Sequence, residues 1–255
     1  MDYTRQVGLL DPKQIKDKSI TVIGAGATGS YVALFLAQMG WGDSTQGQGI
    51  LRVFDGDKVE EHNLANQIYE PNHIGKFKTE ALKEIILKKC GFEIEAFSEM
   101  VDDKTDSSLI RSNYIMLLTD TMSSRKDIFE KHLKFPFTTD LLVETRMGLQ
   151  GGRIYSFNPN ESAHTEEWKA TLYTDNVAEA SACGGSQSIV STVGFLSSLA
   201  VGRIIQHFNY RYGSDNIRQK DSGYYQWNEV QFSLYPETFY LKRFGGDPIL
   251  AMPST

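Results

Sequence analysis

Three glycines with a nucleotide-binding spacing follow the first apolar run of the chain. Gly24, Gly26 and Gly29 form the pattern G-x-G-x-x-G directly after Ile20–Ile23. The first glycine permits a tight turn, the second lets the backbone approach a phosphate, and the third lets the following helix pack on the strand. The N-terminus of that helix attracts negative charge. The pattern predicts a strand-turn-helix unit that binds the phosphates of a nucleotide.

An acidic residue ends the next apolar run. Asp55 follows Leu51–Phe54, a position from which a carboxylate can hydrogen-bond a ribose hydroxyl. Taken alone, the glycines and this acid would indicate a dinucleotide site. A cluster of further polar side chains follows Asp55 and shifts the interpretation. Its members are Asp57, Glu60, Asn63, Gln67 and Lys78.

Apolar runs alternate with helical stretches over the first part of the chain. This alternation predicts an α/β fold with a doubly wound, mostly parallel, Rossmann-like sheet that is covered by helices on both faces. The expected strands are Ile20–Ile23, Leu51–Phe54, Ile94–Ser98, Tyr114–Leu118 and Phe135–Thr139. The expected helices are Ser30–Met39, Lys78–Lys89, Thr105–Arg111 and Ser124–Lys134.

The pattern changes after Val143. Gly151–Phe157 and Tyr224–Phe244 are typical of antiparallel strands, and the apolar stretch Ser188–His207 predicts a helix between them. We therefore expect an antiparallel C-terminal extension of the sheet. With 255 residues, the chain can bury one core of domain size, so we expect a single domain. Its nucleotide-binding half would cover about residues 1–145, and its partner-binding half about residues 146–255.

Charge and composition argue against several classes of protein. The net charge of -6 and the pI near 5.4 disfavour a broad nucleic-acid-binding surface, which needs clustered lysine and arginine. No run reaches roughly 18 apolar residues, and the first residues lack the apolar segment of an export signal. We expect a cytoplasmic protein without a membrane span. The two cysteines, Cys90 and Cys183, form no C-x-x-C pair, so we expect no structural zinc.

Five sequence elements in a fixed order resemble one family of enzymes. They are Arg5-Gln6, G-x-G-A-T-G-S, F-D-x-D-x-V-E-x-H-N-L-x-x-Q, G-K-x-K and L-T-D. At this spacing they are similar to the ThiF/MoeB/HesA adenylyltransferases, the group that includes the ubiquitin-activating enzymes. The resemblance is strong from about residue 5 to residue 125. It continues more weakly through Cys183-Gly-Gly-Ser-Gln-Ser-Ile and the following helix.

The resemblance implies activation of a carboxylate by ATP and Mg²⁺. In that family the carboxylate is usually the C-terminal glycine of a ubiquitin-like or sulfur-carrier protein, and the products are an acyl-adenylate and pyrophosphate. Lys78 would neutralise the phosphate under attack, Asp120 would hold Mg²⁺, and Arg5 would reach the γ-phosphate in a neighbouring subunit. The last role implies a homodimer. The nucleotide site would comprise Gly24, Gly26, Gly29, Asp55, Asp57, Asn63, Gln67 and Lys78.

The chain departs from the family pattern at one phosphate-binding position. Many relatives carry arginine immediately before the glutamine of N-L-x-R-Q, whereas this chain has Asn66. Either Arg5 and Lys78 suffice, or Arg125 or Arg146 compensates, or the activity is altered. Arg146 could alternatively contact a partner's C-terminal tail or pair with Glu144. The cysteine pairs that bind zinc in many members are also missing, which weakens placement in a subfamily.

Cys183 has two interpretations. It lies in a glycine-flanked loop before a helix, whose dipole could lower the thiol pKa and make Cys183 a nucleophile that takes the acyl group as a thioester. It could equally be a small packed residue. Cys90, at the end of an expected helix, is expected to be inert.

Other functions remain open from the sequence. The carboxylate could belong to a small molecule or a modified tRNA base, or the chain could bind a partner without catalysis. An NAD-dependent oxidoreductase would share the glycine turn. However, no His-Asp or Tyr-Lys pair is placed for hydride transfer, and the Asn63, Gln67, Lys78 and Asp120 set has no role in such an enzyme.

Overall fold

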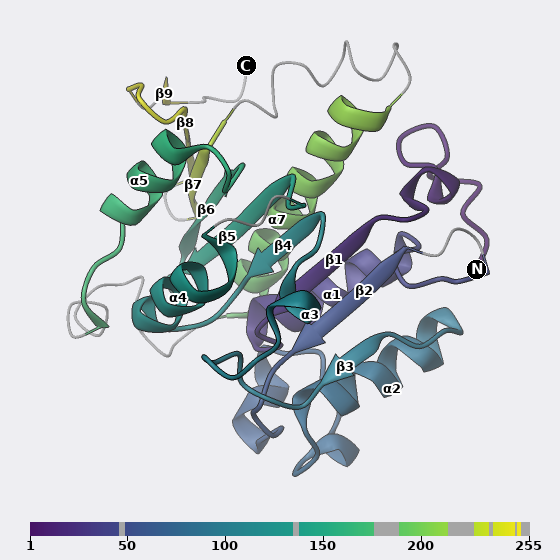
Figure 1. Ribbon diagram of the computed structural model, residues 1–255. Helices are drawn as coiled ribbons and strands as arrows, with labels where there is room; N and C mark the ends of the chain where they lie inside the picture. The colour runs from purple at the N-terminus through teal and green to yellow at the C-terminus, as the bar shows by residue number, and fades with distance from the viewer. Residues whose placement is uncertain are drawn as a thin grey trace.

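The fold is built on one mixed sheet, seen in the computed structural model of the chain (Figure 1). The structure describes residues 1–45, 49–134, 138–175, 189–213, 227–234, 237–247 and 249–250. Within these ranges the strand order is β3-β2-β1-β4-β5-β6-β7-β8-β9. The strands are β1 (Ser19–Ile23), β2 (Ile50–Phe54), β3 (Glu95–Phe97), β4 (Tyr114–Leu117), β5 (Leu141–Met147), β6 (Gly151–Phe157), β7 (Glu229–Leu234), β8 (Glu237–Lys242) and β9 (Ile249–Leu250).

The first five strands are parallel, and the strand order reverses beside β1. From β1 the chain runs outward to β2 and β3, then crosses back to β4 and β5 on the other side. Ile20 of β1 is in register with both Leu51 and Tyr114. Ligands of open α/β sheets bind at such a switch point, outside the carboxyl ends of the strands. The doubly wound prediction is confirmed.

The remaining strands are antiparallel and continue from β5 through β9. β5 and β6 form a hairpin in which Leu142 pairs with Phe157 and Met147 pairs with Gly152. The expected antiparallel extension is therefore confirmed, and the two halves of the sequence share one sheet.

Helices cover both faces of the sheet because neighbouring residues of a buried strand point to opposite sides. In β4, Tyr114 and Met116 face the core shared with α1 and α7, whereas Ile115 and Leu117 face the core shared with α4 and α5. Figure 1 shows α3 and α4 in front of the sheet and α1 and α7 behind it. The α-helices are α1 (Ala27–Gln38), α2 (Lys78–Cys90), α3 (Ser107–Ile110), α4 (Met122–Ile128), α5 (Ser162–Ala170) and α7 (Val190–Tyr212). The short 3-10 helices are η1 (Pro12–Ile15), η2 (Glu61–Ala65) and η3 (Pro71–His73), and the π-helix η4 (Phe129–Leu133) directly follows α4.

The expected strand Phe135–Thr139 is wrong. Residues 135–137 lie outside the described residues, and residues 138 and 139 precede the strand. The strand that pairs with β4 is β5, where Leu141–Glu144 is in register with Tyr114–Leu117. Thr139 instead donates its hydroxyl to the carbonyl of Ser112, at 2.8 Å, in the approach to the strand.

Some expected helices differ in length from the observed ones. Thr105–Arg111 contains only the one-turn helix α3, which Asp106 caps through the backbone N–H of Ser108. The helix expected from Ser188 extends further than predicted, to Tyr212, and residue 188 lies outside the described residues. The polar helix α5 was not expected. Its Trp168 is fully buried, and 4.9 Å separates the ring centroids of Trp168 and Phe129. This packing explains why α5 rests on the sheet.

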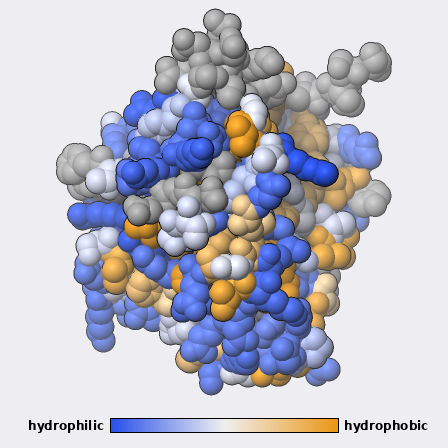
Figure 2. Space-filling model, turned by 90° about the vertical axis from the view of Figure 1, so that its right-hand side faces the viewer, coloured by the Kyte–Doolittle hydropathy of each residue, from blue (hydrophilic) through white to orange (hydrophobic). Residues whose placement is uncertain are grey.

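The face of the molecule in Figure 2 is mostly hydrophilic, with local apolar areas. On the face in Figure 2, hydrophilic side chains predominate in the lower part, and hydrophobic ones gather towards the centre and the right-hand side. Phe35 of α1 and Phe195 of α7 are only partly buried. Among the described helices, none combines the length and apolar character that crossing a membrane would require.

Candidate functional site

A pocket of about 540 Å³ opens at the carboxyl ends of β1, β2 and β4. This is the switch point of the sheet, where parallel α/β folds bind ligands. The pocket brings together most of the site residues expected from the sequence. Those that line it are Gly24, Gly26, Asp55, Asp57, Asn63, Gln67, Lys78 and Asp120.

The glycine turn is tight at two positions. Gly24 has φ of +100°, and a Cβ there would lie 2.7 Å from the carbonyl oxygen of Leu118. A Cβ on Gly29 would lie 1.8 Å from the carbonyl oxygen of Gly24, so α1 packs directly on the turn. Both contacts are shorter than any side chain tolerates, and the turn therefore requires glycine at these positions.

Asp55 connects the end of β2 to the glycine turn. Its Oδ2 accepts the N–H of Ala25 at 2.6 Å, and its Oδ1 accepts the N–H of Asp57 at 2.8 Å. Burial raises the pKa of Asp55, although these two hydrogen bonds and the charge of Lys78 oppose the shift. Each carboxylate oxygen has a second lone pair, so Asp55 can hold the turn and still accept a ribose hydroxyl.

Lys78 and Asp57 form an ion pair inside the pocket, with 2.9 Å between Nζ and Oδ2. The Lys78 side chain is only 9% exposed, whereas that of Asp57 is 53% exposed. The backbone N–H of Lys78, the first residue of α2, also donates to the carbonyl of Asp57 at 2.9 Å. The start of α2 is thus attached to the loop after β2, and this attachment places the lysine at the pocket.

Two polar side chains of the pocket have unused hydrogen-bonding capacity. Among the described residues, the buried Oε1 of Gln67 and the buried Oγ1 of Thr119 have no hydrogen-bond partner. Buried polar atoms are nearly always paired, so such atoms in a pocket fit a polar ligand. Asn63, by contrast, uses its Oδ1 to accept the N–H of Glu60 at 2.9 Å and so caps η2.

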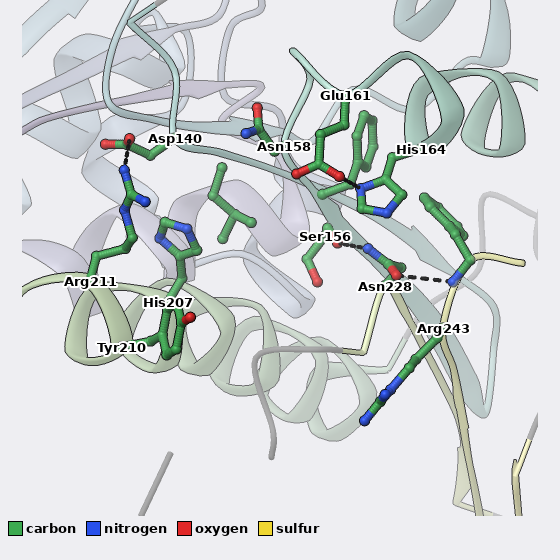
Figure 3. A pocket seen from close by; sticks show the side chains of 13 residues that line it. Asp140, Ser156, Asn158, Glu161, His164, His207, Tyr210, Arg211, Asn228 and Arg243 are labelled. Atoms are coloured by element: carbon green, nitrogen blue, oxygen red, sulfur yellow. Dashed lines mark hydrogen bonds and ion pairs between the residues drawn. The ribbon is translucent and has the colours of Figure 1, made fainter. Parts of the chain in front are cut away.

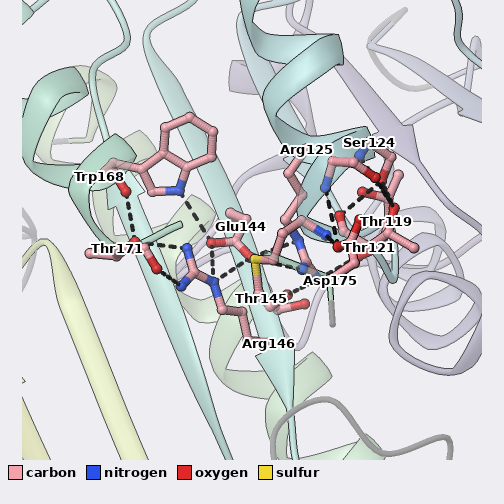
Figure 4. A network of polar contacts seen from close by, with 12 residues as sticks. Thr119, Thr121, Ser124, Arg125, Glu144, Thr145, Arg146, Trp168, Thr171 and Asp175 are labelled. Atoms are coloured by element: carbon pink, nitrogen blue, oxygen red, sulfur yellow. Dashed lines mark hydrogen bonds and ion pairs between the residues drawn. The ribbon is translucent and has the colours of Figure 1, made fainter. Parts of the chain in front are cut away.

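Asp120 is exposed at the rim of the pocket, and a buried ionic network supports its loop (Figure 4). The guanidinium of Arg125 hydrogen-bonds the carbonyl of Thr119, and also that of Thr145 at 3.1 Å. Its Nε lies 2.9 Å from Oε1 of the fully buried Glu144. Arg125 therefore fixes the residue that precedes Asp120.

The same carboxylate holds a second arginine. Both Glu144 oxygens lie 3.1 Å from the Nε of Arg146, whose other nitrogens bond the carbonyl and hydroxyl of Thr171. Neither Arg125 nor Arg146 lines the pocket, and both are at least 96% buried. Pairing with Glu144 is thus the role that the structure gives Arg146, and neither arginine takes the place of the one replaced by Asn66.

Arg5 is not brought to the pocket of its own chain. The exposed Arg5 lies in a segment that is tied down by Tyr3, which donates to Asp43 at 2.9 Å, and by Gln6, which donates to the carbonyl of Met39 at 2.8 Å. Met39 caps the C-terminal end of α1, whereas the glycine turn is at the other end. The helix has 12 residues and so separates the two by about 18 Å.

Cys183 lies outside the described residues. Cys90 is buried at the end of α2, and burial raises the pKa of its thiol. This agrees with the expectation that Cys90 is inert.

A second cavity, of about 530 Å³, lies beside the start of β5 and the end of β6, among side chains of α5 and α7 (Figure 3). Its charged groups are largely paired: Arg211 lies 3.7 Å from Asp140, and His164 lies 2.9 Å from Glu161. Burial lowers the pKa of His207 to about 4. None of the predicted site residues lines this cavity.

The sequence did not single out two residues of the site. Thr119 lines the pocket, and its place in L-T-D before Asp120 was the available signal. Tyr69 is 4% exposed and donates its hydroxyl to the carbonyl of Ala25, in the glycine turn, at 2.6 Å. No sequence pattern pointed to Tyr69.

The solved structures with a similar fold include PaaA, with a TM-score of 0.65 and 16% identity over 98% of this chain and 70% of that one. The complex of E. coli MccB with AMPCPP and MccA has a TM-score of 0.64 and 13% identity, over 94% of this chain and 67% of that one. At this identity the likeness concerns the fold.

Related sequences match a shorter part of the chain. A ubiquitin-like modifier-activating enzyme 5 from Caenorhabditis briggsae is 39% identical over 77 residues, which are 30% of this chain and 16% of that protein. The adenylyltransferase and sulfurtransferase MOCS3 from Oryza sativa is 43% identical over 63 residues, or 25% of this chain and 13% of that protein. The profile of the ThiF family matches residues 3–237, nearly the whole chain. The chain therefore belongs to the ThiF family.

Proposed function

We propose that this chain uses ATP and Mg²⁺ to adenylate a carboxylate, and that the carboxylate is the C-terminal glycine of a ubiquitin-like or sulfur-carrier protein. The observation that carries the proposal is the convergence of the glycine turn, Asp55, Lys78 and Asp120 on one pocket at the switch point. The unpartnered Gln67 and Thr119 oxygens support a polar ligand there.

In the proposed reaction, a carboxylate oxygen of the substrate bonds to the α-phosphorus of ATP. The bond from that phosphorus to the oxygen bridging the β-phosphate breaks, and pyrophosphate leaves with the electron pair. Both reactants are anionic, so the site must hold them together and neutralise charge. Lys78 supplies a fixed positive charge, while the glycine turn supplies backbone N–H donors.

The charge of the pocket supports a requirement for a metal ion. Its described lining contains four carboxylates and a single lysine or arginine, Lys78. Within the described ranges, no group of three or more His, Cys, Asp or Glu side chains is placed to hold a metal ion. Phosphate oxygens would therefore complete the coordination of Mg²⁺, with Asp120 as the protein ligand. When bound, Mg²⁺ would neutralise the triphosphate.

The names of the relatives support the same reaction. One is a ubiquitin-like modifier-activating enzyme, another is an adenylyltransferase and sulfurtransferase, and the MccB structure holds AMPCPP. The assignment of this activity to the chain rests on its family and on the pocket, because the chain matches only a small part of the sequence relatives.

We further propose a homodimer in which Arg5 enters the partner's pocket. Arg5 is exposed, and its anchored segment holds it at the far end of α1 from its own pocket. Partly exposed apolar side chains on α1 and α7 provide surface that a second copy could cover. They are Tyr31, Leu34, Phe35, Phe195 and Leu199.

The test is exchange of labelled pyrophosphate into ATP, with a ubiquitin-like protein that ends in Gly-Gly as the carboxylate. We expect Mg²⁺-dependent exchange that Asp120→Ala abolishes, because the metal loses its protein ligand. Asp127→Ala removes an exposed carboxylate of α4 that does not line the pocket, and it should exchange normally. Exchange by Asp120→Ala at the wild-type rate would disprove the metal assignment. Calorimetry that shows binding of NAD but not of ATP would disprove adenylation.

A further inference from the structure

Both polar groups of Ala25 are held by side chains from other parts of the chain. Its N–H donates to Asp55 at 2.6 Å, and its carbonyl accepts the hydroxyl of Tyr69 at 2.6 Å. Ala25 is fully buried and Tyr69 is 4% exposed. Ala25, which lies between Gly24 and Gly26, is thus fixed through both its backbone N–H and its carbonyl.

The bond from Tyr69 also sets the direction of the next N–H. The carbonyl of Ala25 and the N–H of Gly26 belong to one planar peptide group, in which they point in opposite directions. Because Tyr69 holds the carbonyl, the Gly26 N–H is directed away from Tyr69. Among the described residues, no backbone or side-chain acceptor takes this N–H.

The side of Gly26 is open to the pocket. Gly26 is part of the pocket lining, and a Cβ built on it would meet no atom within 4 Å. Tyr69 contacts the turn through the Ala25 carbonyl and is not among the lining residues. Burial and the nearby Asp55 and Asp57 raise the pKa of Tyr69 well above its ordinary value, so its hydroxyl stays protonated at neutral pH and can donate.

We propose that Tyr69 is a positioning residue of the nucleotide site, which holds the Ala25–Gly26 peptide so that the Gly26 N–H meets a phosphate oxygen of the bound nucleotide. This inference rests on the proposed function, since it requires a nucleotide in the pocket. Tyr69 follows Gln67 by two residues, and Gln67 lines the same pocket. The bond to Ala25 therefore also fixes the segment that carries Gln67 relative to the turn.

The test compares the wild type with Tyr69→Phe, which keeps the ring and removes only the hydroxyl. We expect the Kd for Mg·AMPCPP, measured by calorimetry, to rise about 5-fold to 10-fold, the effect of one hydrogen bond. The Kd for adenosine, measured by ligand-observed NMR, should not change, because adenosine has no phosphate. Tyr240→Phe removes a hydroxyl from the exposed face of β8 and serves as the control.

Three outcomes would overturn the inference. An unchanged Kd for Mg·AMPCPP in Tyr69→Phe would show that the hydroxyl does not orient the turn. An equal loss of affinity for adenosine and Mg·AMPCPP would show a general structural role. A wild-type protein that binds neither ligand would disprove the proposed function itself, and the role of Tyr69 with it. Failure of the proposed function is thus seen in the wild type, whereas failure of the Tyr69 inference alone is seen only in Tyr69→Phe.

Discussion

The Nζ of Lys78 lies 2.9 Å from a carboxylate oxygen of Asp57, so the lysine of the pocket is paired before any substrate arrives. Such a pair keeps a flexible side chain in one place, and a preorganised charge is worth more in a transition state than a mobile one. The pair also connects the loop after β2 to the start of α2, because the Lys78 N–H donates to the same residue.

Lys78→Ala should lower the maximal rate of pyrophosphate exchange by roughly 10²-fold or more, since a fixed charge at the reacting phosphate is lost. Steady-state kinetics at saturating ATP measures this effect. Lys83→Ala is the control, because Lys83 lies on the same helix but pairs with Glu93 at the surface. A raised KM with an unchanged maximal rate would instead place Lys78 in ground-state binding.

Glu144→Gln should lower the free energy of unfolding by about 3 to 5 kcal/mol, because Arg125 and Arg146 would remain buried without their carboxylate. Urea unfolding measures the change. Glu84→Gln removes an exposed partner of Lys76 and should cost less than about 1 kcal/mol. Equal losses for the two variants would show that the buried network does not hold the loop of Asp120 in the way described.

Arg5→Ala and Asp120→Ala chains should each be inactive alone and should regain activity when mixed. A mixed dimer contains one pocket with both an intact Asp120 and an intact partner arginine, so up to about half of the sites in mixed dimers should work. Exchange assays after subunit mixing measure the recovery, and sedimentation confirms the dimer. Complete exchange of subunits without recovery of activity would contradict the action of Arg5 in the partner's pocket.

Cys183→Ala should preserve pyrophosphate exchange while it abolishes a reducible covalent adduct with the carboxylate substrate. Adenylation uses the nucleotide pocket, whereas thioester formation requires the thiolate. Mass spectrometry of the adduct measures the second step. Iodoacetamide should react with Cys183 faster than with Cys90, whose thiol is buried. Full product formation by Cys183→Ala would show direct transfer from the adenylate to an external acceptor.

The stability of the protein should depend on pH through His207, whose pKa burial lowers from 6.5 to about 4. Between these values the unfolded chain binds a proton that the folded chain does not. Stability from this group is thus complete above about pH 6.5 and is lost as the pH falls towards 4, by at most about 3 kcal/mol. His207→Gln should flatten the profile in urea unfolding over this range. Parallel profiles for the two proteins would contradict this role of His207. They would assign the pH dependence to other groups, such as the nearby Asp140.

Much of the nucleotide pocket could be predicted from the sequence because its residues follow short, mostly apolar strands. Ile20–Ile23, Leu51–Phe54 and Tyr114–Leu118 mark β1, β2 and β4 within one residue at their carboxyl ends. In a parallel sheet these ends meet at one edge, so the residues after them converge. The positions of Asp55 and Asp120 at the pocket follow from this rule.

The parts that sequence reasoning missed depend on tertiary pairing. β5 contains Glu144 and Arg146, and charged residues at alternate positions indicate an exposed strand. The two instead pair with each other in the interior, and the strand was therefore expected at Phe135–Thr139, just before the real one. Tyr69 is similar, because its partner Ala25 lies 44 positions away and no local pattern reports such a contact.

Gly29 and Gly26 have very different surroundings in the turn, so substitutions at these two positions would have different consequences during evolution. At position 29 any side chain collides with the carbonyl of Gly24, so a substitution there disrupts the fold and with it every function of the protein. At position 26 a methyl group meets open space on the pocket side, so it would spare the fold and occupy the room of the ligand. A lineage that kept the scaffold for partner binding but no longer used the pocket would retain Gly29 and lose Gly26.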